Sequence, residues 1–86
     1  MNIGKLYRVK KVTKSRNINV VIISESPNLL FNKTLDVLNN NDIFIPLEQS
    51  GKTSGLEVIK VCTPKGITGY AAFFRNEFSY EEVNNS

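Results

Sequence analysis

The residues that do chemistry in most enzymes are scarce in this chain. It has no histidine, the commonest general base in proteins. Its single cysteine, Cys62, lies in an apolar stretch without a histidine partner, so we interpret it as a small buried hydrophobic residue. The only adjacent carboxylates, Glu81 and Glu82, would point to opposite faces of a strand. The spacing of carboxylates and glycines matches no metal or phosphate site. The sequence therefore predicts a protein that is not an enzyme and that takes no cofactor and no metal.

Basic residues are concentrated at the start of the chain. The first 24 positions carry six basic and no acidic residues, whereas the remainder carries five basic and eight acidic residues, a net charge of −3. Such asymmetry is typical of a surface that meets an anionic partner. Alternatively, lysines on an exposed strand prevent edge-to-edge pairing. The candidate nucleic-acid-binding residues, all within segment 5–16, are Lys5, Arg8, Lys10, Lys11, Lys14 and Arg16.

Aromatic residues gather toward the other end of the chain. Strand alternation places Phe73 and Phe74 on opposite faces, so both cannot enter one small core. One of them is expected to join an exposed apolar patch, which often marks a protein interface. Alternatively, the last strand or residues 26–41 cover it. The candidate protein-binding residues are Tyr7, Tyr70, Phe73, Phe74 and Tyr80.

Alternating and β-branched residues predict an all-β fold. Pro46 has no N–H to donate and is expected at a sheet edge or a bulge. If the first two predicted strands pair, residues 14–17 form the tip of their hairpin. Phe78 and Val83 are expected to attach the final segment to the core. Strands are predicted over residues 3–12, 18–24, 43–47, 56–62 and 69–74, with turns at 39–42 and 64–66.

Residues 26–41 have two interpretations. In one, Ser26 and Pro27 begin a short helix around residues 27–38, whose apolar spacing fits one helical face. In the other, the segment is an irregular excursion that places its apolar side chains in the core. Its asparagines are poor residues for a helix interior. Both interpretations stay open from the sequence.

The order of these elements over residues 35–83 resembles the SH3-like barrel family. The opening Lys5-Leu6-Tyr7 also resembles the Ala-Leu-Tyr at the start of SH3 domains. The resemblance implies a small barrel of five or six antiparallel strands. The other matching residues are Asn41-Asp42-Ile43, Leu47-Glu48, Val58-Ile59-Lys60-Val61, Pro64-Lys65-Gly66, Gly69-Tyr70 and Glu82-Val83.

The chain departs from the SH3 domains that bind proline-rich peptides. It has no tryptophan at the start of the central strand, and Ala71-Ala72-Phe73-Phe74 replaces their proline-and-tyrosine segment. Recognition of a polyproline helix needs an aromatic groove. The resemblance therefore implies their fold without their ligand.

We expect a single domain over residues 1–83 with a disordered tail at 84–86. We expect it to be a small non-enzymatic binding module whose partner is another protein, with nucleic-acid binding as the alternative. No apolar run approaches the ~20 residues that cross a membrane. One cysteine and an N-terminus without a signal-peptide pattern favour the cytoplasm. Abundant asparagine, isoleucine and lysine are typical of AT-rich genomes, so a phage accessory or host-interaction factor is one interpretation.

Overall fold

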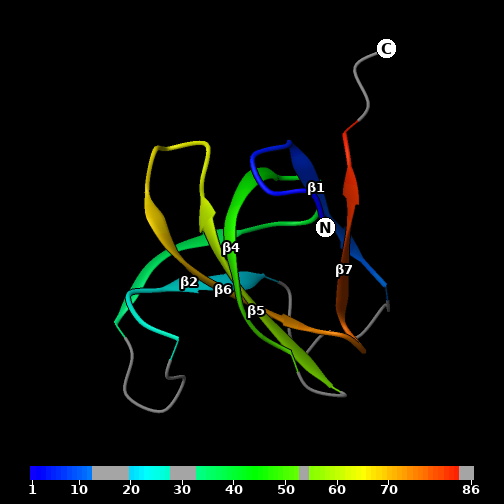
Figure 1. The fold of residues 1–86 in the computed structure, drawn as a ribbon. Coiled ribbons are helices and arrows are strands. Elements are labelled where there is room, and N and C mark those ends of the chain that lie inside the picture. The colour runs from blue at the N-terminus through cyan, green and yellow to red at the C-terminus, as the bar shows by residue number, and fades with distance from the viewer. Residues whose placement is uncertain (13–19, 28–32, 53–54, 84–86) are drawn as a thin grey trace.

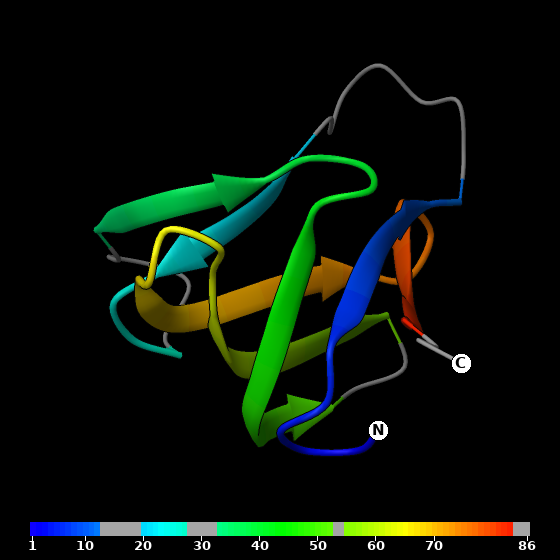
Figure 2. The same cartoon turned by 90° about the horizontal axis from the view of Figure 1, so that it is seen from above.

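The computed structural model of the chain describes residues 1–12, 20–27, 33–52 and 55–83, and this described part contains strands and no helix (Figure 1). The strands form one antiparallel sheet in the order β3-β2-β6-β5-β4-β1-β7. The sheet curls into a half-barrel, as the view from above shows (Figure 2). Its seven strands are β1 (Tyr7–Lys11), β2 (Val21–Ser24), β3 (Thr34–Leu38), β4 (Ile43–Lys52), β5 (Leu56–Cys62), β6 (Thr68–Phe74) and β7 (Phe78–Glu82).

Strand β4 joins the two parts of the curled sheet. Its first residues pair with β1, where Phe44 lies opposite Tyr7. From Ile45 onward it pairs with β5. The register shifts between Pro46 and Glu48, because a proline cannot continue the ladder of backbone hydrogen bonds. Of the two positions expected for Pro46, a sheet edge or a bulge, the structure shows the bulge.

The number of strands exceeds the predicted five or six. Residues 34–38 form strand β3, so the helix predicted around 27–38 is wrong there, and so is the irregular excursion. The reason is tertiary, since β3 pairs along β2 with Val37 opposite Ile22. The rest of that prediction falls partly on residues 28–32, which lie outside the described residues.

The first two strands, whose pairing the sequence left as a condition, do not pair with each other. Strand β1 pairs with β4 and β7, whereas β2 pairs with β3 and β6. Most of the connection that would have formed the hairpin tip, residues 13–19, lies outside the described residues, as does the tail at 84–86.

Two predicted turns are confirmed. In the first, Asn41 has a φ of 74°, a left-handed conformation that asparagine tolerates, and the Asn39 N–H donates to Asp42 Oδ2 at 2.7 Å. In the second, the Gly66 N–H donates to the Thr63 carbonyl at 2.9 Å, and Gly66 has a φ of 81°. The second turn leads directly from β5 into β6.

The hydrophobic core lies on the inner, concave face of the sheet. Its aromatic part joins strands that are far apart in sequence, because Phe44 of β4 contacts Tyr7 of β1 and Phe73 of β6 at centroid distances of 5.9 and 5.5 Å. The most deeply buried aliphatic residues are Val9, Val21, Ile23, Leu38, Ile59 and Val61.

We predict that Gly69→Ala destabilises the fold. A Cβ atom at Gly69 would lie 2.6 Å from Ile23 Cγ2 and 2.8 Å from the Ser24 carbonyl oxygen, where β6 meets β2. The carbonyl belongs to the backbone and cannot rotate away, so the free energy of unfolding should fall by about 2 kcal/mol. Urea denaturation followed by circular dichroism measures the change.

The matched control is Gly51→Ala, because a Cβ atom at Gly51 meets nothing within 4 Å. Its unfolding free energy should stay within about 0.5 kcal/mol of the wild type. Equal stability of the two variants would contradict the close approach of β6 to β2.

Candidate functional site

The five predicted protein-binding aromatics divide between the two faces of the sheet. Phe73 is 1% exposed and Phe74 is 41% exposed, so their predicted placement on opposite faces is confirmed. Tyr7 is buried and Tyr80 half-buried, and with Phe73 they form part of the inner ring cluster. Only Phe74 and the half-buried Tyr70 lie on the outer face.

The outer face carries a run of apolar side chains across four strands. Val37 of β3 lies opposite Ile22 of β2. Continuing the β2–β6 register by one residue brings Ile22 beside Ala72, which lies opposite Val58 of β5. Phe74 follows on the same face of β6, since strand residues two apart share a face.

We call this surface the outer patch. Three of its members are exposed: Ile22 to 46%, Val37 to 38% and Phe74 to 41%. Val58 and Ala72 are buried, at 8% and 7% exposure. Its residues are Ile22, Val37, Leu56, Val58, Ala72 and Phe74.

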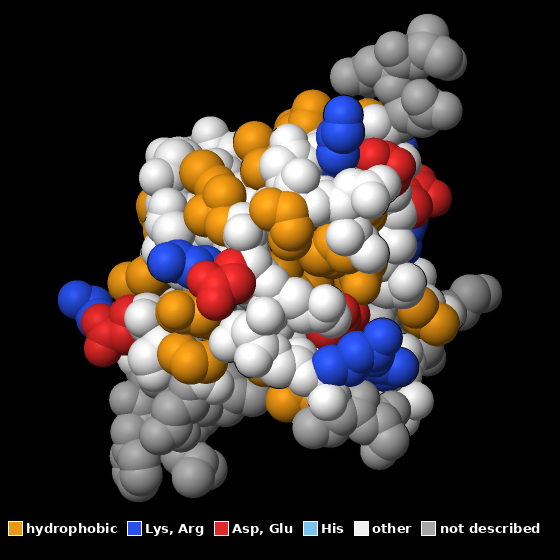
Figure 3. All heavy atoms as spheres, in the orientation of Figure 1, with side chains coloured by type: hydrophobic (Ala, Val, Ile, Leu, Met, Phe, Trp, Pro, Cys, Tyr) orange, Lys and Arg blue, Asp and Glu red, His pale blue; other side chains and the backbone are white. Residues whose placement is uncertain are grey.

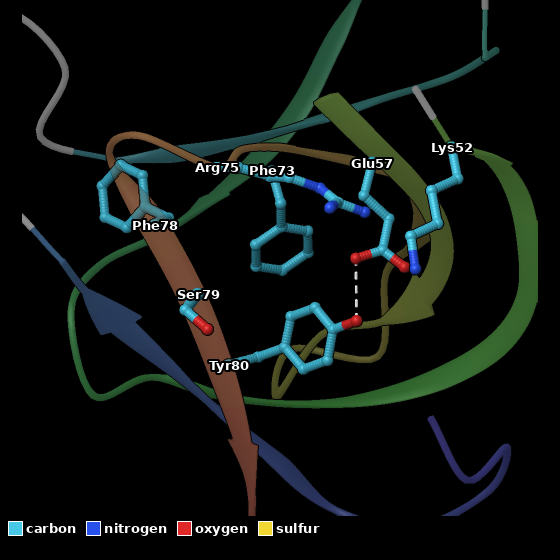
Figure 4. A pocket seen from close by; sticks show the side chains of 7 residues that line it. All are labelled: Lys52, Glu57, Phe73, Arg75, Phe78, Ser79 and Tyr80. Carbon is cyan, nitrogen blue, oxygen red and sulfur yellow. Dashed lines mark hydrogen bonds between the residues drawn. The ribbon is translucent and has the colours of Figure 1, made fainter. Parts of the chain in front are cut away.

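The second feature is a pocket of about 350 Å³ at the open side of the half-barrel, which we call the Glu57 pocket. Its walls come from the end of β4, the start of β5, the end of β6 and the first half of β7 (Figure 4). The lining residues are Lys52, Glu57, Phe73, Arg75, Phe78, Ser79 and Tyr80.

Glu57 is the polar residue on which this pocket depends. It is only 5% exposed, because it points to the same face of β5 as Ile59 and Val61. Both of its oxygens are satisfied: the Tyr80 hydroxyl donates to Oε1 at 2.7 Å, and Gln49 Nε2 donates to Oε2 at 2.6 Å. Burying a carboxylate without such donors would destabilise the folded state by roughly several kcal/mol.

Glu57 also changes the acidity of Tyr80. Burial, and then the hydrogen bond to Glu57 and its negative charge, raise the pKa of the Tyr80 phenol well above its usual value. The phenol therefore stays protonated and continues to donate its hydrogen bond.

Two basic side chains lie on either side of the Glu57 carboxylate. Figure 4 shows Arg75 and Lys52 extending toward it from opposite sides of the pocket. Neither forms an ion pair with an acidic residue in the described part of the chain. The pocket mouth therefore carries positive charge that is not neutralised by a direct partner.

The structure places an acidic strand beside the basic segment. Pairing of β1 with β7 brings Glu81 to 3.8 Å from Arg8 and 3.5 Å from Lys10. Lys5 is exposed and Lys11 half-buried, while Lys14 and Arg16 lie outside the described residues. On the face in Figure 3, acidic and basic side chains lie interspersed instead of forming one basic surface. The charge asymmetry of the sequence is thus partly offset in the fold.

Comparison with known proteins gives no relative. No protein-family model, curated protein or solved structure matches this chain. The site must therefore be interpreted from its own chemistry.

Three observations describe the chemistry of the site. Within the described residues, no three His, Cys, Asp or Glu side chains are placed to hold a metal ion, and no helix is long and apolar enough to cross a membrane. Cys62 is half-buried, not buried as predicted, and its Sγ lies 3.6 Å from the Thr63 carbonyl. What the site offers is an exposed apolar face and a polar pocket.

Sequence reasoning missed the Glu57 pocket, and of the outer patch it named only Phe74. One signal was present, because strict alternation along 56–62 puts Glu57 on the face of Ile59 and Val61. No local sequence pattern indicated that Ile22 and Val37 lie on the outer face, since their position depends on which face of β2 meets the core.

We predict that Tyr80→Phe destabilises the protein through Glu57. The variant removes one donor from a buried carboxylate, so the free energy of unfolding should fall by about 1–3 kcal/mol at neutral pH.

The effect of Tyr80→Phe on the free energy of unfolding should also depend on pH. Below about pH 10 the tyrosine is protonated in both the folded and unfolded states, so its contribution is constant. Above that pH only the unfolded state ionises, and the wild type should lose stability faster than the variant.

Urea unfolding at several pH values between about 8 and 11 measures both effects. Tyr70→Phe is the control, because Tyr70 lies on the outer face beneath Lys60. If Tyr70→Phe and Tyr80→Phe behaved alike, the hydrogen bond to Glu57 would not carry this stability.

Proposed function

We propose that this protein is a small non-enzymatic binding module that engages another protein through the outer patch. The observation that carries the proposal is the exposure of Ile22, Val37 and Phe74 together on one face of the sheet. Isolated exposed apolar side chains are ordinary, but a contiguous group is typical of an interaction surface.

The shape of the surface fits a protein partner better than a small ligand. The outer patch lies on the side of the sheet away from the concave core, and the Glu57 pocket lies elsewhere. Shallow apolar surfaces with an exposed aromatic side chain resemble the centres of protein interfaces, where such residues contribute most of the affinity. Tyr70 and Lys60 lie opposite each other next to the patch and supply a polar border.

We also propose that the fold is an SH3-like barrel. The curled antiparallel sheet, the bulge at Pro46 and the turn at 64–66 support this assignment. Nucleic-acid binding by residues 5–16 stays a prediction, and Glu81 beside Arg8 and Lys10 weakens the case for it. The phage origin also stays a prediction.

We predict that Phe74→Ser abolishes capture of the partner. Burying such a side chain in an interface contributes roughly 1.5–3 kcal/mol, so its loss should weaken binding by about tenfold or more. The tagged protein is used to capture partners from a lysate of its source cells, and bound proteins are quantified by mass spectrometry. Ile22→Ser should remove the same proteins.

The matched control is Ile43→Ser. Ile43 is 37% exposed, similar to Ile22, but it lies on β4 opposite Arg8 of β1. Proteins lost with Phe74→Ser and Ile22→Ser but retained with Ile43→Ser are the partners that the proposal requires. If no protein shows this pattern, the outer patch is not a protein-binding surface.

A further inference from the structure

The half-barrel leaves two strands at the margins of the sheet, β3 and β7. An edge strand exposes backbone N–H and C=O groups that can pair with another chain. The edge at β3 is partly blocked, because the Val37 N–H donates to Asp36 Oδ1 at 2.8 Å and Lys65 lies 3.5 Å from the same carboxylate. The Asp36 side chain is 8% exposed, whereas nothing comparable lies along β7 among the described residues.

The register of β7 shows which of its backbone groups are unpaired. The Val83 N–H donates to the Leu6 carbonyl, and β7 continues along β1 with Glu81 opposite Arg8. In an antiparallel ladder only alternate residues bond to a given neighbour. The N–H and C=O groups of Phe78, Tyr80 and Glu82 therefore point away from β1, and no other described strand pairs with β7. Figures 1 and 2 both show β7 at the margin of the fold.

The two ends of this edge carry opposite charges. Phe78 lines the Glu57 pocket together with Arg75 and Lys52, which have no acidic partner within ion-pair distance among the described residues. At the other end, Glu82 is exposed and also lacks a described ion-pair partner. Glu82 shares the face of Phe78 and Tyr80, because residues two apart in a strand point to the same side.

We propose that β7 pairs with β7 of a second copy of this chain, antiparallel and about a two-fold axis at Tyr80. In this register Phe78 of each copy lies opposite Glu82 of the other. The backbone N–H and C=O groups of both residues point away from β1, so they are free to form the hydrogen bonds of the new ladder. The Glu82 carboxylate of each copy then faces the mouth of the Glu57 pocket of the other copy, which Arg75 and Lys52 line together with Glu57.

A second copy fits this edge better than an unrelated strand does. A two-fold axis makes the same residues meet twice, so one pair of complementary ends supplies two sets of ion pairs. The charges that remain unpartnered at the pocket mouth and at Glu82 are thereby both neutralised. The proposal uses β7 and leaves the outer patch on β2, β3, β5 and β6 untouched, so it does not rest on the proposed function.

We predict that the wild-type chain is a concentration-dependent dimer and that charge swaps at the edge control it. Sedimentation equilibrium of the full chain from about 1 µM to about 1 mM should show the average mass rising from one chain to two. Glu82→Arg would face Arg75 and Lys52 of the other copy, so dimerisation should weaken by at least about tenfold. The double variant Lys52→Glu, Arg75→Glu would face Glu82 and should weaken it similarly.

Mixing the two variants is the decisive experiment. In the mixed pair, the arginine introduced at position 82 faces the two introduced glutamates, and the native Glu82 faces native Arg75 and Lys52. A one-to-one dimer should therefore return. Glu48→Arg makes the same charge change on β4, away from this edge, and should leave dimerisation unchanged. Circular dichroism establishes that every variant is folded.

Three results would overturn the proposal: a monomeric wild type up to about 1 mM, a mixture that stays monomeric, or an equal loss with Glu48→Arg. The variant Phe74→Ser distinguishes a failure of the proposed dimer from a failure of the proposed function. It should abolish partner capture and leave the dimer intact, whereas Glu82→Arg should do the reverse.

Discussion

The contact among four aromatic rings holds the two parts of this sheet together. Tyr7, Phe44, Phe73 and Tyr80 come from β1, β4, β6 and β7, and their contacting rings lie 5.3 to 6.3 Å apart, several of them edge to face. Such pairs add to the stability that burial alone provides. Because a curled sheet needs a filled concave face, these rings set how far β7 approaches β5, and with it the position of the Glu57 pocket. They also explain why Tyr7 and Phe73 are buried and Tyr80 is half-buried.

Features set by a few neighbouring residues could be predicted from the sequence. The turn at 64–66 follows from proline and glycine chemistry, the bulge from the missing N–H of Pro46, and the opposed faces of Phe73 and Phe74 from simple alternation. Strand β3 was missed because its five residues share an apolar spacing with a short helix, and only pairing with β2 decides between them. The pairing of β1 with β7 links residues that are far apart in the chain, such as Tyr7 and Glu82, and no local pattern contains it.

Charge shows the same difference between what neighbouring residues determine and what contacts between distant strands determine. A count along the chain places six basic residues in a segment without acids, yet the fold sets Glu81 beside two of them. Glu57 shows the converse case. Its inward position can be read from alternation in β5, but its donors, Gln49 and Tyr80, come from two other strands. A sequence can thus indicate that a charge is buried before it can indicate what satisfies it.

An open half-barrel has consequences that a closed barrel would not have. Closure removes edges, whereas this sheet keeps them at β3 and β7. In the order of the sheet, β4 and β1 lie between β7 and β5, a strand of the outer patch. A two-fold pair would then present two outer patches on one particle. Where a partner offers repeated binding sites, two weak apolar contacts acting together bind far more tightly than either does alone. Such avidity would suit a patch with few exposed side chains, because each single contact can then stay weak.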